Sequence, residues 1–175
     1  MSHTPTTGSA YTSDMVETWE WCVTHQNDDP LNPIMIISTS FGGGRYTDQA
    51  VCGNESPAMT AAAANARAVG ITLFVSSGND GYCDAIGWPG CLSDVISVGA
   101  VYDAALGKIG WCVSEDSCCH PKIPTDGCSS GYYTPESGAA DLVTAYSNTA
   151  SFLSLFAPAN WAYTTNLSGG YWDTP

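Results

Sequence analysis

The residues best suited to chemistry lie at positions 76–81 (SSGNDG), directly after an apolar run that begins at Ile71. An Asn amide in a Gly-flanked turn at the end of a buried strand can donate hydrogen bonds to negative charge that develops on a carbonyl oxygen. The chemistry would then be acyl transfer, with Asn79 as the oxyanion donor. Asn-Asp-Gly is also a strong turn signal, so these residues alone leave open a purely structural role for Asn79.

A second apolar run, residues 33–38, ends in the small and polar residues 39–44 (TSFGGG). Ligands of open α/β sheets bind at the carboxyl ends of the strands, and exposed backbone there can pair with an extended peptide. We therefore expect two segments to face each other across a peptide slot: Ser40, Phe41, Gly42 and Gly43 from the first run, and Ser76, Ser77 and Gly78 from the second. A phosphate cradle is the rival interpretation of the Gly run, but the G-x-G-x-x-G spacing and the Lys of a P-loop are missing.

One further motif matches a nucleophile pattern. Residues 127–131 (GCSSG) fit G-x-S-x-G, which requires a strand before the Ser and a helix after it. The match lies in a segment rich in Cys and Pro, so we interpret it as chance.

The composition limits the possible partners. The chain has 175 residues, of which 44% are hydrophobic, as expected of one domain or a large part of one. Only 4 Lys+Arg oppose 17 Asp+Glu, for a net charge of −13, so there is no basic surface to release counterions from phosphate. No apolar run is long enough to cross a bilayer. We expect neither a nucleic acid nor a membrane as partner.

Eight Cys residues indicate an oxidising compartment and disulfide bonds. No C-x-x-C occurs, and His3, His25 and His120 do not form a ligand pair, so no metal site is predicted from these residues. Cys83 and Cys91 bracket the loop after Asn79 and are the first expected pair. The chain does not open on a secretory signal, and the simplest expectation is an internal piece of a longer exported protein.

The hydrophobic pattern predicts an α/β domain. A Ser13 or Asp14 cap opens the first helix, and Ser56-Pro57 opens the second. The expected strands are residues 33–38, 71–76, 94–101 and 150–156, with a break at 157–158, and the expected helices are residues 14–25 and 58–69. Strand, helix and strand at this spacing form a right-handed crossover with parallel strands. Residues 103–140 show no clear periodicity and are expected to form a disulfide-pinned excursion.

These segments, taken in order, resemble the subtilases, the subtilisin-like serine endopeptidases. Residues 36–43 (IISTSFGG) are similar to the family's substrate-pairing strand and Ser-Leu-Gly segment, and residues 75–81 (VSSGNDG) to the segment with the oxyanion Asn. Residues 87–90 (GWPG) resemble the Gly-Tyr-Pro piece behind the specificity pocket, which implies a substrate-binding role for Gly87, Trp88 and Pro89. Residues 95–100, 150–153 and 156–158 match the later segments that precede the family nucleophile.

The departures from the family pattern concern the catalytic triad. The sequence contains neither Gly-Thr-Ser-x-Ala-x-Pro, which carries the family nucleophile, nor His-Gly-Thr, which carries the family histidine. The family aspartate belongs to a strand well before the matched region. The resemblance therefore implies a single partial subtilase catalytic domain over residues 1–175, with the excursion at about 103–140 as an addition.

The resemblance implies a fold and a function. The fold is a three-layer subtilisin-like α/β domain, with a mainly parallel central sheet and helices on both faces, here incomplete. The function is that of a secreted serine endopeptidase acting on polypeptides, with this chain inactive by itself. A noncatalytic secreted peptide-binding module or pseudoprotease is the alternative. The family also admits calcium as a cofactor and a propeptide elsewhere in the parent chain, although Asp28 and Asp29 fit a solvated turn better than a calcium site.

Overall fold

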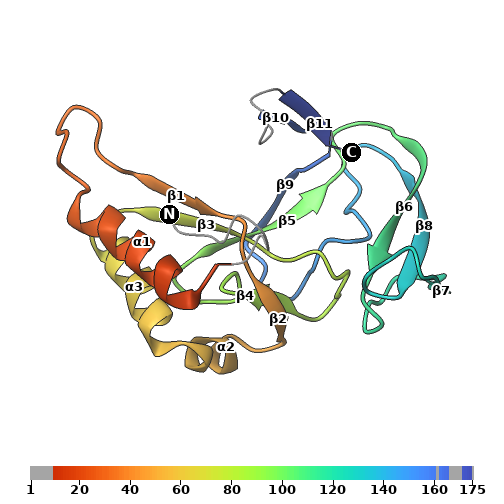
Figure 1. Ribbon diagram of the computed structural model, residues 1–175, viewed down its shortest axis with the longest axis horizontal. Coiled ribbons are helices and arrows are strands. Elements are labelled where there is room, and N and C mark those ends of the chain that lie inside the picture. Colours follow the sequence, from red (N-terminus) through yellow and green to blue (C-terminus); the bar gives the residue numbers. More distant parts are fainter. Residues whose placement is uncertain (1–9, 161, 166–170, 175) are drawn as a thin grey trace.

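The computed structural model describes residues 10–160, 162–165 and 171–174 (Figure 1). Its centre is a parallel four-stranded sheet in the order β1-β3-β5-β9. The strands are β1 (Ile36–Thr39), β3 (Thr72–Ser76), β5 (Ile96–Val101) and β9 (Leu155–Pro158). The predicted parallel sheet is thus confirmed. The predicted break at Ala157-Pro158 is wrong, because both residues pair with the end of β5.

Three helices are described: α1 (Thr12–Thr24), α2 (Gln49–Glu55) and α3 (Pro57–Ala68). The Ser56 side chain accepts from the Met59 N–H at 3.3 Å, and Pro57 occupies the first turn, as the sequence predicts for α3. The predicted cap of α1 is wrong. The helix starts at Thr12, and its N-cap is Tyr11, two residues before Ser13, with no side-chain cap hydrogen bond.

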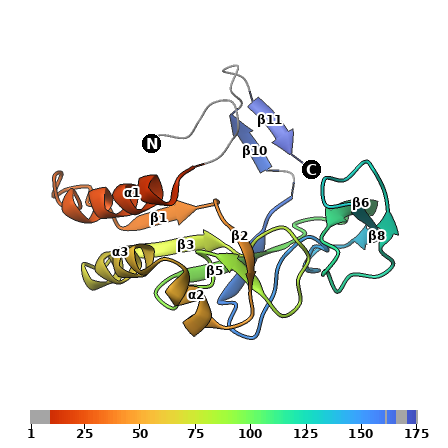
Figure 2. The same cartoon turned by 60° about the horizontal axis from the view of Figure 1, so that its bottom comes forward.

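One face of the central sheet is covered by α1 and α3, which pack against each other (Figure 2). Ile37, Leu73 and Val75 are buried on this face with Trp19 of α1, and the Trp19 indole N–H donates to Thr39 Oγ1 at 3.1 Å. The opposite face carries the alternate residues of the strands. Among them Ile36 is 62% exposed, and no helix of the described part of the chain lies over this face. The described part of the chain thus has helices on one face of the sheet only, which makes it an incomplete form of the predicted three-layer fold.

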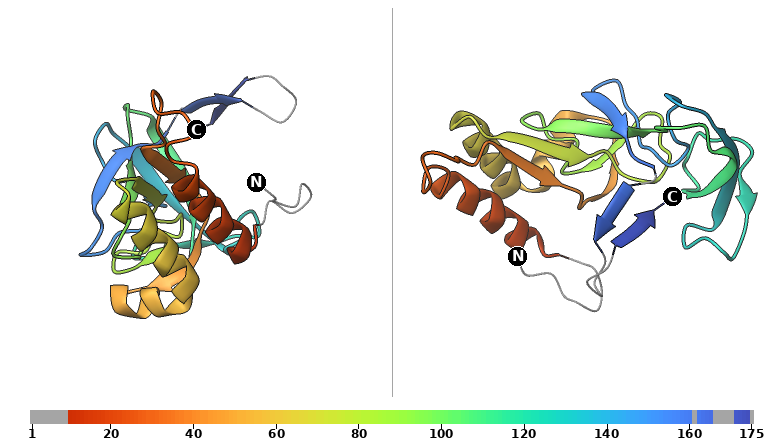
Figure 3. Two further views of the ribbon diagram at one scale, coloured as in Figure 1. Left: turned by 90° about the vertical axis from the view of Figure 1, so that its left-hand side faces the viewer. Right: turned by 90° about the horizontal axis from the view of Figure 1, so that it is seen from above.

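The structure also contains smaller antiparallel sheets. β2 (Gly43–Tyr46) pairs with β4 (Ile86–Trp88), and β10 (Ala162–Thr165) pairs with β11 (Tyr171–Thr174). Residues 103–140 are more regular than their sequence suggests. They form the sheet β6-β8-β7, from β6 (Gly107–Val113), β7 (Ile123–Pro124) and β8 (Tyr132–Gly138). This excursion sheet lies at the end of the molecule opposite α1 and α3 (Figure 3).

The disulfide bonds correct a prediction. Cys91 pairs with Cys52 of α2, and Cys83 pairs with Cys118 of the excursion, so the expected Cys83–Cys91 bond is wrong. A third bond, Cys112–Cys128, links β6 to the segment between β7 and β8. Between Cys83 and Cys91 the chain enters β4, which pairs with β2. Cys91 therefore lies in the core against α2, while Cys83 faces the excursion.

Candidate active site

An open groove of about 1320 Å³ runs along the carboxyl ends of β1, β3 and β5. Four of the predicted residues that follow these strands line it together: Ser40, Ser77, Gly78 and Asn79. Ser76, the last residue of β3, lines it as well. Strands β1 and β3 are parallel neighbours, so the segments that leave them emerge at the same edge. The structure therefore brings the two predicted strand ends to one groove.

Asn79 is placed so that its amide is available to a ligand. The residue is exposed, and it takes part in none of the side-chain hydrogen bonds between described residues. Its neighbours are held firmly. The Ser77 N–H donates to the Val98 carbonyl at 2.9 Å, and the Gly81 N–H donates to the Tyr146 carbonyl at 2.9 Å. A free donor group is thus presented from a fixed loop.

Phe41, Gly42, Gly43, Gly87, Trp88 and Pro89 do not line this groove. Gly43 pairs with Trp88 across β2 and β4, and a Cβ at Gly42 would lie 2.3 Å from the Trp88 carbonyl oxygen. The Gly87 N–H donates to the Ser77 carbonyl at 2.8 Å. Phe41 lies at a separate cavity beside α1. Residues 41–43 and 87–89 thus form a layer packed behind the Ser77 loop, and the close approach at Gly42 requires glycine.

The excursion supplies a wall of the groove that the sequence did not predict. Trp111, Ile123, Pro124 and Tyr133 line the cavity, together with Tyr146. The Trp111 and Tyr146 rings contact edge to face, with centroids 4.7 Å apart. The pairing of β6, β8 and β7 brings the four residues of the excursion together. Their aromatic and aliphatic character was the one signal in the sequence, and it does not distinguish a groove wall from a core.

A buried polar network attaches the excursion to the central sheet. Tyr102, just past β5, is 0% exposed; its hydroxyl donates to the Glu136 carboxylate and accepts from the Trp111 indole at 2.6 Å. Glu136 also accepts from the Ala145 N–H at 3.0 Å. Burial, and after it the hydrogen bond to Glu136, raises the pKa of the Tyr102 phenol. Burial likewise raises the pKa of Tyr146.

We expect Tyr102→Phe to lower the free energy of unfolding by about 1–3 kcal/mol near neutral pH, because Glu136 and Trp111 lose a buried partner. The folded pKa of this phenol lies above its unfolded value, so its stabilisation is present below about pH 10 and is lost as pH rises through the folded pKa. The alkaline loss of stability should therefore be smaller in the variant. Urea unfolding at several pH values measures both effects. Tyr11→Phe, at a 71% exposed position, is the control, and an equal effect at Tyr11 would contradict the expectation.

The described residues do not offer a metal site. No group of three or more His, Cys, Asp and Glu residues within the described ranges could hold an ion. In the turn after α1, Asp29 accepts from the Leu31 N–H and from the Asn32 amide, and the Asn32 hydrogen bond leads the causes that lower the Asp29 pKa. This is the solvated turn that the sequence predicts. Within the described ranges the acidic residues do not gather into a ligand set for the calcium that the resemblance to the family admits.

The histidines of the described ranges do not line the groove that Asn79 lines. His25 stacks on Trp21 of α1, and His120 lines a different cavity; His3 lies outside the described residues. The G-x-S-x-G match falls between β7 and β8, so a strand and not a helix follows it, and the prediction that it is a chance match stands. None of the helices in the described ranges is both long and apolar enough to span a membrane.

The architecture is a parallel sheet with helices on one face and an open groove at the carboxyl ends of its strands, and an incomplete subtilisin-like domain has these features. The chain belongs to the subtilase family, whose sequence profile matches residues 2–174. It is 37% identical over 99 residues to serine protease AprX of Bacillus subtilis (strain 168), an alignment that covers 55% of this chain and 21% of AprX. The family is one of serine proteases.

Solved structures support the same fold. A cold-adapted subtilisin-like serine proteinase superposes with a TM-score of 0.58 at 18% identity, covering 96% of this chain and 43% of that one. The prenylagaramide maturation protease PagA superposes with a TM-score of 0.61 at 16% identity, covering 98% of this chain and 46% of that one. The chain thus spans about a fifth of the curated relative and less than half of these solved structures.

Proposed function

We propose that these 175 residues belong to a secreted serine endopeptidase and supply its oxyanion donor and part of its substrate groove. The Asp, His and Ser of the triad would lie on polypeptide outside these residues. One observation carries the proposal. From a fixed loop at the edge of a groove that Ser40, Ser76 and Gly78 also line, Asn79 presents an exposed amide that makes no side-chain hydrogen bond within the described ranges. The three disulfide bonds between described residues support an extracellular location.

The roles in this proposal follow from the chemistry of acyl transfer. A Ser hydroxyl attacks the scissile carbonyl, a His takes its proton, and an Asp orients the His. Negative charge grows on the carbonyl oxygen, and the Asn79 NH₂ donates to that oxygen where it is most negative. The amide therefore binds the transition state better than the substrate.

The substrate would be an extended polypeptide. Ser40 continues the chain past the end of β1 and lines the groove. An extended peptide can pair with exposed backbone at such a strand end, which would leave its scissile carbonyl beside Asn79. The apolar wall formed by Trp111, Ile123 and Tyr133 then contacts the substrate from the opposite side. A propeptide elsewhere in the parent chain would use the same groove.

Assays of the isolated chain test whether the catalytic triad lies outside these residues. We expect the purified 175-residue chain neither to hydrolyse casein nor to react with a fluorophosphonate, with subtilisin as the positive control in both assays. Stoichiometric labelling would contradict the absence of a nucleophile. The parent reading frame tests the rest of the proposal. If it holds no Gly-Thr-Ser-x-Ala-x-Pro motif, the parent is a pseudoprotease.

A noncatalytic peptide-binding module is the second candidate, and the open groove in a chain whose sequence has no triad motif favours it. Such a module needs the backbone near Ser40 but has no use for the Asn79 amide. Calorimetry with an extended apolar peptide measures the binding that both candidates require. Ser40→Pro, which removes a backbone donor, should weaken it in either case, whereas Asn79→Ala should leave this ground-state binding unchanged in both. Peptide binding without catalysis in the full-length parent would favour this candidate.

A further inference from the structure

Among the described contacts, the buried Asn148 side chain makes all its hydrogen bonds to the loop that carries Asn79. Asn148 is 0% exposed. Its Oδ1 accepts from the backbone N–H groups of Asp80 at 2.9 Å and Tyr82 at 3.1 Å. Its Nδ2 donates to the Ser77 carbonyl and to Asp80 Oδ2, each at 3.1 Å. Both donor hydrogens and the acceptor oxygen are thus used, and every partner lies within residues 77–82.

The backbone around Asn148 holds the same loop. The Asn148 N–H donates to the Gly78 carbonyl at 3.1 Å, and the Tyr146 carbonyl accepts from Gly81. Gly78 has a φ of +108°, and a Cβ there would lie 2.3 Å from Asn148 Nδ2. Glycine is therefore required at position 78 both by its backbone conformation and by the closeness of the Asn148 amide.

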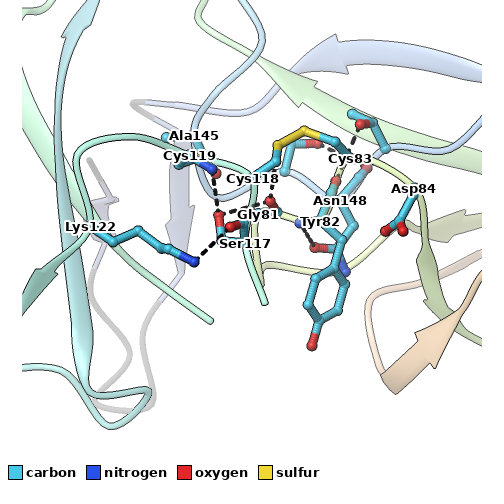
Figure 4. Close-up of a disulfide and its surroundings, with 12 residues drawn as sticks. Gly81, Tyr82, Cys83, Asp84, Ser117, Cys118, Cys119, Lys122, Ala145 and Asn148 are labelled. Carbon is cyan, nitrogen blue, oxygen red and sulfur yellow. Dashed lines mark hydrogen bonds between the residues drawn. A yellow bond between two sulfur atoms is a disulfide. The ribbon is translucent and has the colours of Figure 1, made fainter. Parts of the chain in front are cut away.

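The Cys83–Cys118 disulfide and Asn148 flank the loop (Figure 4). The disulfide fixes the point at which the loop joins the excursion. Ser117 adds a hydrogen bond from its hydroxyl to the Gly81 carbonyl at 2.9 Å. These contacts act on residues 81–83, beyond Asn79. Among the described contacts, the Asn148 side chain is the one that binds backbone on both sides of Asn79, at Ser77 and at Asp80.

We propose that Asn148 is a positioning residue that preorganises Asn79. Residues 77 and 80 are held at fixed points, so the exposed Asn79 amide keeps one approach to the groove although it makes no side-chain hydrogen bond to another described residue. A preorganised donor needs no rearrangement when charge develops on the substrate. The inference rests on the proposed function, because it gives the fixed loop a catalytic purpose beyond satisfying buried backbone groups.

The first test uses the 175-residue chain and amide hydrogen exchange measured by NMR. In Asn148→Ala we expect about tenfold or faster exchange at Asp80 and Tyr82, since each N–H loses its buried acceptor, and shifted or broadened Asn79 amide signals. Met59→Ala, in the fully buried core of α3, is the control for general destabilisation. Asn79 signals that respond equally to Met59→Ala and Asn148→Ala would overturn the proposal.

The second test uses the full-length protease and a double-mutant cycle. We expect Asn148→Ala to lower kcat by about 10- to 100-fold with KM nearly unchanged, since misplacing a catalytic group acts on the transition state. In the Asn79→Ala background the same change should lower kcat less than about threefold, because the two residues act as one unit. If Asn79→Ala alone leaves kcat unchanged, the proposed function fails. If Asn79→Ala lowers kcat but Asn148→Ala lowers kcat by the same factor in both backgrounds, only the positioning role is wrong.

Discussion

On the proposed function, Asn79→Ala should lower kcat of the full-length parent by about 100- to 1000-fold, the range found for removing an oxyanion Asn of subtilisin. KM should change little, because the amide binds the developing oxyanion and not the ground-state carbonyl. Initial rates on a chromogenic peptide, over a range of substrate concentrations, separate the two constants.

The control for this prediction is Asn54→Ala. Asn54 is an exposed Asn on α2, distant in the sequence from both groove segments, and its loss should leave kcat and KM unchanged. A circular dichroism melt should show that Asn79→Ala folds as the parent does, since the exposed Asn79 amide makes no hydrogen bond to the described part of the chain. A kcat loss below about threefold would contradict the oxyanion role of Asn79, because removing one such donor usually costs far more.

Local signals in the sequence were sufficient for the elements next to the site. The apolar run before Asn79 is a buried strand, and Ser56 with Pro57 starts α3, because capping and strand formation depend on residues close in the chain. The meeting of Ser40 with Asn79 also followed from the sequence, since neighbouring parallel strands end at one edge of their sheet. Subtilase membership follows from the same ordered segments.

The features that the sequence did not reveal depend on distant pairing. β6 and β8 pair in a register that places Trp111 opposite Thr134. No periodicity within either segment predicts this pairing. Asn148 stands in an unremarkable polar stretch, and only the folded chain shows that its partners are at residues 77–82. The predicted Cys83–Cys91 bond failed for the same reason. Closeness in sequence favoured it, whereas β4 carries Cys91 into the core.

The Cys52–Cys91 bond should be the largest single contributor to stability among the three described disulfides. It closes a loop across a sequence separation of 39 residues, against 35 for Cys83–Cys118 and 16 for Cys112–Cys128. Both of its sulfurs belong to fully buried residues, and it joins α2 to the segment after β4. Replacing both residues with Ala should lower the free energy of unfolding by about 4 kcal/mol through the added freedom of the unfolded chain. Urea unfolding followed by Trp fluorescence measures the change.

Cys22→Ala is the matched control, because Cys22 is a free thiol on α1 packed at the edge of the same core. Its loss should cost much less, and adding a reductant should then destabilise the Cys22 variant more than the Cys52/Cys91 double variant. The Cys112/Cys128 pair should cost about 3 kcal/mol, since its loop is shorter. Peptide mapping without reduction must recover Cys52 linked to Cys91. A Cys83–Cys91 peptide, or a loss below about 1 kcal/mol in the double variant, would contradict the role of this bond in joining α2 to the core.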